Sequence, residues 1–298
     1  MAPAGAAVTR RWSQDARNGL PHPWRLNGLS HAILSVLLVS LALTCASCQA
    51  APSADAGSTP LRISGSTSMA PVLRELADAY RSKHPNVQVE VLGNGSQAGL
   101  QELKASKIDL AAVSWKAEGE EIPAGLRAVP FARDGIAIVV HPSNRVTGLT
   151  LAQARSLYRG EIQDWKALGG PALETSVISR EDGSGTRDAF EAAVMGGERV
   201  TFNAQVIPTT QAVVEHVRRH PEAVGYVSMA ALTDTVRAVP IEGLLPTSAV
   251  VRDGAYHLTR HLYLFAPTNP APEVSRFLDF IHSAEGQAII RRRHVSLG

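Results

Sequence analysis

One loop of this chain combines the residue types that can hold a tetrahedral anion. The run Arg180-Glu-Asp-Gly-Ser-Gly-Thr186 follows a short apolar stretch and precedes an amphipathic one. Arginine presents a planar fork that matches two oxygens of such an anion, and serine, threonine and backbone N–H groups can bind the other oxygens. Asp182 is expected to fix the orientation of Arg180. Taken alone, the run is equally compatible with a surface arginine–aspartate pair beside a turn.

Two further places repeat the design of a strand, a short Gly/Ser/Thr loop and a helix. They are Ser64-Gly-Ser-Thr-Ser68 and Gly93-Asn-Gly-Ser96. Free N–H groups and the dipole at a helix N-terminus favour a negative charge. Serine and threonine also cap helices, so any one of these loops by itself indicates local capping. Three of them in one chain favour a shared anion site.

From residue 60 onward, short apolar runs alternate with amphipathic helical patterns, which is typical of an α/β fold. The ordering of these patterns predicts two α/β lobes. Helices are expected at 68–84, 96–106, 150–158, 186–195, 210–219, 272–283 and 285–292, and strands at 61–64, 87–92, 108–113, 136–140, 177–179, 224–227 and 261–265.

The N-terminal part of the chain has the pattern of an export signal. Residues 32–44 form an uncharged run of 13 residues behind an arginine-bearing segment. This run is too short to span a bilayer, which needs roughly 20 residues. We therefore expect an export signal over 1–48, followed by a linker over 49–59 that has little to bury.

The only two cysteines, Cys45 and Cys48, lie at the end of this segment, so the rest of the chain has no disulfide. Ala46-Ser47-Cys48 is similar to the end of a bacterial lipoprotein signal, which makes Cys48 a candidate for lipidation. Plain cleavage near Ala50 is the alternative.

The composition is that of a globular protein rather than a disordered one. Of the 298 residues, 45% are hydrophobic and 19% are charged. The formal net charge is +2, and the arginines of the leader account for it, so the body is close to neutral. A near-neutral body argues against nucleic acid as a partner.

Seven motifs, in this order, give the chain a resemblance to the phosphate-binding subunit of bacterial phosphate-uptake ABC transporters. The resemblance covers nearly all of 60–298. The motifs are Ser64-Gly-Ser-Thr-Ser-Met-Ala-Pro71, Gly93-Asn-Gly-Ser-Gln-Ala-Gly99, Ile108-Asp-Leu-Ala-Ala-Val-Ser114, Asp134-Gly-Ile-Ala-Ile-Val-Val140, Gly160-Glu-Ile-Gln-Asp-Trp165, Ser179-Arg-Glu-Asp-Gly-Ser-Gly-Thr186 and Ser283-Ala-Glu-Gly-Gln287.

The resemblance implies a two-lobed periplasmic-binding-protein fold of type II, an α/β fold with mixed sheets flanked by helices. Lobe 1 would comprise 60–138 plus 256–298 and lobe 2 would comprise 139–255, with the ligand in the cleft between them. It also implies an exported, extracytoplasmic, monomeric protein that captures inorganic phosphate for the membrane permease of an ABC importer. No catalytic activity, metal or cofactor is implied, and a lipid anchor would be the only membrane contact.

The same resemblance assigns roles to residues of the three loops. Arg180 would bind the anion through two hydrogen bonds, and Asp182 would orient it. The remaining donors would be Thr67, Ser68, Ser96, Ser184, Gly185 and Thr186.

Ser114 departs from the pattern of many family members, which have an aspartate at this position. That carboxylate accepts the proton of hydrogen phosphate and repels sulfate. A serine can both donate and accept, so rejection of sulfate does not rest on a like-charge clash here. Asp134 is a candidate for the missing acceptor, although the sequence does not place it in the cleft.

Other functions have weaker support from the residues. His216 and His220, like His257 and His261, have a spacing compatible with metal ligation but lack a carboxylate at metal-site spacing. A hydrolase or phosphotransferase is a rival, yet the usual serine-hydrolase and phosphate-loop motifs do not occur. The fold would also suit a binding protein for another oxyanion such as sulfate, or a phosphate-sensing lipoprotein.

Overall fold

The computed structural model describes residues 60–115 and 121–297, and these residues belong to one compact unit. The expected export signal, the linker and the lipidation candidate Cys48 lie outside the described residues. Within the two described ranges, no helix is long and apolar enough to cross a bilayer.

Strands and helices alternate along most of the chain. The first part consists of β1 (Leu61–Gly65), α2 (Ala70–Lys83), β2 (Val89–Gly93), α3 (Ser96–Lys104), β3 (Leu110–Val113) and β4 (Leu126–Val140). The middle consists of α4 (Leu151–Tyr158), the 3-10 helix η2 (Trp165–Leu168), β5 (Ser176–Ser179), α5 (Gly185–Ala193), β6 (Gln205–Val206), α6 (Thr210–Arg219), β7 (Ala223–Ser228), η3 (Met229–Ala231), β8 (Arg237–Val239) and α7 (Ser248–Arg252). The last part consists of β9 (Thr259–Pro267), α8 (Pro272–His282) and α9 (Ala284–Arg291).

The strands form one mixed sheet in the order β2-β1-β3-β9-β4-β7-β5-β6, and β8 pairs with β4. β1 runs parallel to both β2 and β3, and β5 runs parallel to both β6 and β7. Parallel neighbours need crossover connections, which the helices α2, α3, α5 and α6 provide. The carboxyl ends of β1 and β2 therefore lie at one edge of the sheet, where α2 and α3 begin.

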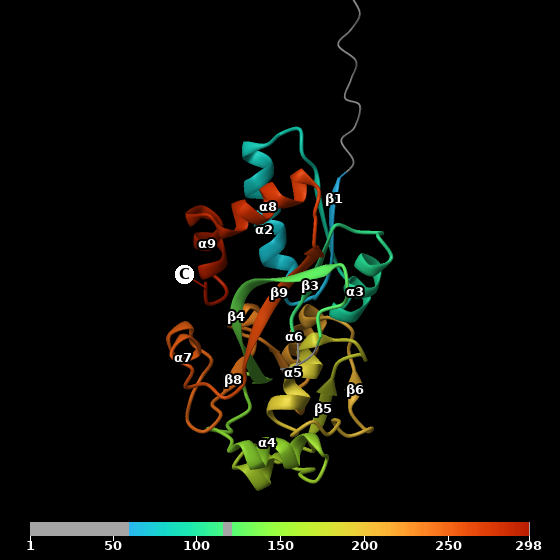
Figure 1. Cartoon of the computed structure of the whole chain (residues 1–298). Coiled ribbons are helices and arrows are strands. Elements are labelled where there is room, and N and C mark those ends of the chain that lie inside the picture. The colour runs from blue at the N-terminus through green and yellow to red at the C-terminus, as the bar shows by residue number, and fades with distance from the viewer. Residues whose placement is uncertain (1–59, 116–120, 298) are drawn as a thin grey trace, which may run out of the picture. The chain divides into compact units, whose positions relative to one another are not determined.

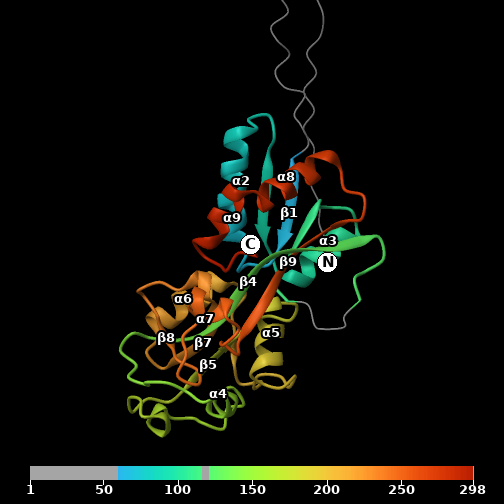
Figure 2. The ribbon, with the colours of Figure 1, turned by 60° about the vertical axis from the view of Figure 1, so that its left-hand side comes forward.

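β4 and β9 connect the two halves of this sheet. The first part of β4, Leu126–Gly135, pairs with β9, and its last part, Ile136–Val140, pairs with β7. In Figures 1 and 2, α2, α8 and α9 lie on one side of this crossing pair, and α4, α5 and α6 lie on the other. Each side has its own large apolar core.

The helices that begin at the predicted loops are held by their apolar faces. In α2, Val72, Leu73 and Leu76 are fully buried, at the spacing of one helix face. In α5, Phe190 stacks on Tyr226 of β7 with ring centroids 4.1 Å apart. This packing holds both helices in place, with their N-terminal ends near the crossing of β4 and β9 (Figure 1).

All of the expected helices and strands are confirmed to within a few residues, except that β4 is much longer than predicted. The strand expected at 136–140 is only the last third of β4. Pro130, Arg133 and Asp134 interrupt its apolar pattern, so only pairing with β9 extends the strand back to Leu126. The short elements β6, β8 and α7 carry no clear periodicity and were not predicted.

Candidate functional site

The starts of three helices meet at one place, as the loop motifs predict. A Cβ atom added to Gly185, the first residue of α5, would lie 2.7 Å from the Oγ atoms of both Ser96 and Ser114. The N–H of Gln97 in α3 donates to the carbonyl oxygen of Gly183 at 3.1 Å. The loop 180–186 therefore lies directly against the start of α3 and the end of β3.

Gly183 permits this approach for two reasons. Its φ of +83° falls in the left-handed region, and a Cβ atom there would lie 2.6 Å from the Oε1 of Gln97. Ser184 then caps α5, because its hydroxyl accepts from the N–H of Arg187. The next residue with a side chain, Thr186, is buried, and its hydroxyl accepts from Arg260 of β9.

Arg180 is almost completely buried, at 1% exposure. Its Nη2 donates to the hydroxyl of Thr67 at 3.1 Å and to the carbonyl oxygen of Pro208 at 2.8 Å. Its Nη1 donates to the hydroxyl of Thr210 at 3.4 Å. Within the described residues that threonine is the single partner of Nη1, so one of its two hydrogens remains for a ligand oxygen.

Glu181, not Asp182, orients Arg180. The carboxylate of Glu181 accepts from Nε and Nη2 of Arg180 at 3.1 and 2.9 Å. The Asp182 side chain is 74% exposed and pairs with Arg187 and Arg199 instead. The expected role of Asp182 is therefore wrong: the residue next to the arginine folds back onto it, while the following one turns outward ahead of Gly183.

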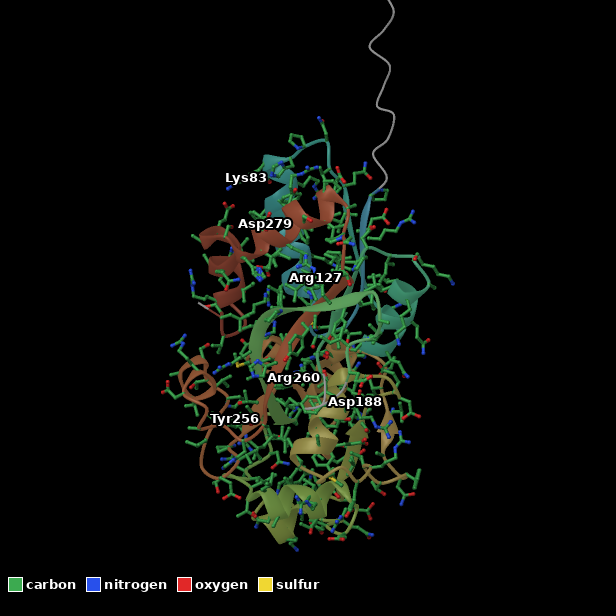
Figure 3. The ribbon with its side chains drawn as sticks, in the orientation of Figure 1. Lys83, Arg127, Asp188, Tyr256, Arg260 and Asp279 are labelled. Carbon is green, nitrogen blue, oxygen red and sulfur yellow. The ribbon has the colours of Figure 1, made fainter. Side chains whose placement is uncertain are left out.

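A second buried arginine faces the same place. Arg260 of β9 donates from Nη1 to the hydroxyl of Thr186 at 2.8 Å and from Nη2 to the hydroxyl of Ser68 at 3.1 Å. Its Nε and Nη2 also donate to the Oδ2 of Asp134 at 2.9 and 2.7 Å. Figure 3 shows Arg260 between the upper part of the ribbon, which holds α2 and α8, and the lower part, which holds α4 and α5. The sequence reasoning did not single out this residue.

The charges of the neighbouring groups affect the pKa values of both Asp134 and Arg260. Burial tends to raise the pKa of Asp134, but Arg260 and the neighbouring His294 outweigh it and hold this pKa below its usual value. Burial lowers the pKa of Arg260, Asp134 opposes that effect, and the positive charge of Arg180 lowers this pKa further. Two guanidinium groups are thus close enough to repel one another, and an anion between them would relieve that repulsion.

Ser114, at the end of β3, is also part of this arrangement. Its Oγ lies 3.3 Å from the Oγ of Ser96, and its backbone N–H donates to the same atom at 3.2 Å. Asp134 does not replace the absent carboxylate at this position. Its Oδ1 accepts from Ser228 and its Oδ2 accepts from Arg260, so both oxygens are already engaged.

A cavity of about 250 Å³ opens beside the meeting point of the three helices. Ser96, Gly183 and Trp115 contribute to its lining, together with Asp188 of α5, which is labelled in Figure 3. Ser96 and Gly183 come from the predicted anion-binding loops, so the cavity borders two of those loops.

The structure brings together all of the predicted site residues except Asp182. These residues are Thr67, Ser68, Ser96, Ser114, Arg180, Ser184, Gly185 and Thr186. The set consists of hydroxyls, one buried guanidinium group and the N-terminal ends of three helices, all of which donate hydrogen bonds. Such a set suits an oxyanion and offers no arrangement for a cation. No group of three or more metal-ligating side chains occurs in the described part of the chain.

One sequence signal could have revealed Arg260 and the burial of Asp134. Along β9, Arg260 is in phase with the buried Leu262 and Leu264, and along β4, Asp134 is in phase with Ile136. The period-two pattern therefore places each charged residue on a buried face. Their direct pairing across the two strands, however, depends on a register that only the structure gives.

The comparisons with known proteins agree with this fold. The model of a PBP superfamily domain matches residues 50–285. The phosphate-binding protein PstS of Borreliella burgdorferi is 26% identical over 245 residues, which cover 78% of this chain and 87% of that protein. PstS of Bacillus subtilis is 26% identical over 240 residues, which cover 77% of each protein.

Solved structures give the same result. A phosphate ABC transporter substrate-binding protein of Clostridium perfringens, crystallised with bound phosphate, is 37% identical, with a TM-score of 0.76 and coverage of 80% of this chain and 99% of that one. An ABC-type phosphate transport receptor of Vibrio cholerae is 33% identical, with a TM-score of 0.66 and coverage of 80% and 100%. The predicted fold class is confirmed, and the chain belongs to the PBP superfamily of periplasmic-binding-protein folds.

Proposed function

We propose that this chain is the phosphate-binding component of an ABC importer. The observation that carries this proposal is the buried Arg180, whose guanidinium contacts the hydroxyl of Thr67, just ahead of α2, and that of Thr210, at the start of α6. Relatives named as phosphate-binding or phosphate-transport proteins support phosphate as the anion. The chain acts by binding rather than by catalysis, because its site presents hydrogen-bond donors and no nucleophile–base pair.

In this proposal the anion is held by Thr67, Ser68, Ser96, Ser114, Arg180, Ser184, Gly185 and Thr186. Its oxygens accept from these hydroxyls, from Arg180 and from the N–H groups that open α2, α3 and α5. The lobes 60–138 plus 256–298 and 139–255 close over it. Burying the anion strengthens each of these hydrogen bonds, because little water remains to compete for the donors.

The cellular setting follows from the expected export signal and the family. The protein is exported, acts as a monomer outside the cytoplasm, and hands phosphate to the permease of the importer. Lipidation of Cys48 would anchor it to the membrane surface. A phosphate-sensing lipoprotein with the same site is the alternative role. Deletion of this chain, with the permease left intact, would distinguish the two by its effect on phosphate uptake.

Titration calorimetry with phosphate and with sulfate tests the binding function. We expect phosphate to bind with micromolar or tighter affinity, about 8 kcal/mol or more, and more tightly than sulfate. Equal affinity for the two anions would contradict the assignment to phosphate and favour a general oxyanion receptor. Release of product from a chromogenic phosphate ester would instead support a hydrolase function.

The substitution Arg180→Ala tests the site itself. Because this arginine is buried and would face the anion, its loss should weaken phosphate binding by about 3 kcal/mol or more. The matched control is Arg199→Ala, since Arg199 is half exposed and pairs with Asp182 at the surface. Unchanged affinity in Arg180→Ala would remove the site assignment, whereas the control should bind like the unmodified protein.

A further inference from the structure

The buried pair formed by Asp134 and Arg260 lies immediately behind the proposed anion site. Both side chains are fully buried, and they join β4 to β9 directly opposite one another in the sheet. A buried ion pair contributes little net stability compared with apolar residues of the same volume. Its position, between the hydroxyls of Ser68 and Thr186, points to a different role.

A hydroxyl group that accepts a hydrogen bond from a guanidinium has its own hydrogen left to donate. Thr186 accepts from Nη1 of Arg260 at 2.8 Å, and within the described residues no other partner of its hydroxyl competes for that role. Ser68 accepts from Nη2 of Arg260 at 3.1 Å, although its Oγ also lies 2.9 Å from the Oγ of Ser66. Thr186 is therefore the clearer case of a hydroxyl fixed as a donor.

We propose that Arg260, held in place by Asp134, is a positioning residue that fixes the hydroxyls of Thr186 and Ser68 as donors and so makes the site select the dianion of phosphate. This inference rests on the proposed phosphate-binding function and adds a selectivity to it. A hydroxyl that is polarised by a guanidinium is a stronger donor and a weaker acceptor, so it favours a bare anionic oxygen over a P–OH group.

The remaining hydroxyl pair explains why one protonated oxygen is still tolerated. Ser96 and Ser114 contact one another without a guanidinium between them. The Oγ of Ser96 already accepts from the backbone N–H of Ser114, so the Oγ of Ser114 is the better acceptor for a P–OH group. Hydrogen phosphate carries one such group and dihydrogen phosphate carries two. The site thus offers an acceptor for the single P–OH group of the dianion. The second P–OH group of the monoanion would face a hydroxyl that acts as a donor, which is unfavourable.

The test is the pH dependence of phosphate affinity, measured by calorimetry from about pH 8 to about pH 5, a range that spans the ionisation of a phosphate group. In the unmodified protein, affinity for total phosphate should fall by about tenfold per pH unit once the monoanion predominates. Constant affinity across this range would overturn the proposal. Absence of phosphate binding at every pH would instead contradict the proposed function.

Other charged or titratable groups lie near Arg260, and sulfate separates their effects from those of the ligand. They are Asp134, Arg180, Glu181 and His294. Sulfate keeps its charge throughout this pH range, so its affinity reports only the titration of the protein. The phosphate profile is therefore interpreted after subtraction of the sulfate profile.

The double variant Asp134→Leu, Arg260→Met removes the pair without leaving an unpaired charge. The hydroxyl of Thr186 is then no longer polarised as a donor, so phosphate affinity should drop by about tenfold at the higher pH and its pH dependence should become shallower. Circular dichroism and a thermal melt establish that the variant is folded. If it does not fold, Arg260→Lys carries the same test, since an ammonium cannot reproduce the fork that holds Asp134, Ser68 and Thr186 together.

Thr186→Val is the matched comparison. It removes the hydroxyl altogether, so affinity should fall while the steep pH dependence is retained, because valine offers no acceptor to a P–OH group. Thr259→Val, next to Arg260 in β9 but with its hydroxyl directed to the carbonyl oxygen of Tyr256, should change neither quantity. A folded pair variant with the affinity and pH dependence of the unmodified protein would overturn the proposal.

Discussion

Adjacent carboxylates in the anion-binding loop have different environments. Glu181 holds Arg180 from inside the loop, whereas the Asp182 side chain is 74% exposed. Exposed ion pairs contribute about 0–1 kcal/mol, so Asp182→Asn should leave phosphate affinity unchanged within about 0.5 kcal/mol. Calorimetry on this variant beside Arg180→Ala makes the comparison. A large loss of affinity in Asp182→Asn would restore the role that the motif suggested for it.

The identities of the site residues were predictable to the extent that they lie in loops before helices. Ser68, Ser96 and Thr186 are recognisable because glycine-rich loops with hydroxyls mark helix starts. The partner of Arg180 was not predictable, since either of two adjacent carboxylates fits the sequence. Only the turn at Gly183, with its φ of +83°, decides that Asp182 points outward.

Asp134 should make the stability of the protein sensitive to acid. Its pKa in the folded state lies below the usual 3.8, because Arg260 and His294 outweigh the effect of burial. A carboxyl group with a lowered folded-state pKa contributes stability above its unfolded pKa and loses it as the pH falls through the folded value. We therefore expect this contribution to be intact at neutral pH and to be lost progressively as the pH falls below about 4.

Urea unfolding at neutral pH and at about pH 3 measures this effect. The unmodified protein should lose more stability between the two conditions than the Asp134→Leu, Arg260→Met variant, which has no carboxyl group at position 134 to protonate. Asp78→Asn, which changes an exposed carboxylate beside Arg81, serves as the control and should behave like the unmodified protein. Equal losses in all three proteins would show that Asp134 is not responsible.

Among the secondary-structure elements, β4 shows most clearly what sequence periodicity misses. Its apolar last third was predicted, but the part that carries Asp134 was not, because charged residues and Pro130 break the pattern. Pairing with β9 makes that part a strand. Helices with one apolar face, such as α2, were predicted well because their periodicity is local. The position of Arg260 was missed because it depends on register between distant strands.

At the start of α5, one substitution would change the distance between α5 and the neighbouring elements without removing a hydrogen-bonding side chain. In Gly185→Ala the added Cβ would lie 2.7 Å from the hydroxyl oxygens of Ser96 and Ser114, closer than such contacts allow. Phosphate affinity should fall by about tenfold or more, or about 1.4 kcal/mol. The fold should be retained, because alanine is favourable in a helix and the loops can separate.

Calorimetry and a thermal melt on Gly185→Ala provide both readouts. Gly148→Ala is the matched control, since its added Cβ would approach no atom closer than the carbonyl oxygen of Pro240 at 3.4 Å. Unchanged phosphate affinity in Gly185→Ala would mean that the close approach of α5 to α3 is not required for binding.

For the molecule as a whole, the arrangement of contacts suggests a hinge. Strands β4 and β9 run continuously between the two halves, whereas the contacts at the anion site are polar and made by loops. The hydrogen bonds from Arg180 to Thr67 and from Gln97 to Gly183 are among these contacts. Polar contacts of this kind exchange readily with water, while a paired strand does not. Opening should therefore occur at the site, with β4 and β9 bending.

Small-angle scattering tests this hinge with and without phosphate. An anion that accepts hydrogen bonds from both lobes favours the closed arrangement over the open one, so added phosphate should reduce the radius of gyration. Gly185→Ala at saturating phosphate should show a smaller reduction, because the added methyl group keeps α5 away from Ser96 and Ser114. Gly148→Ala should contract like the unmodified protein. If phosphate binds tightly and the radius of the unmodified protein stays constant, the two lobes are already closed without ligand, and binding selects the anion without hinge motion.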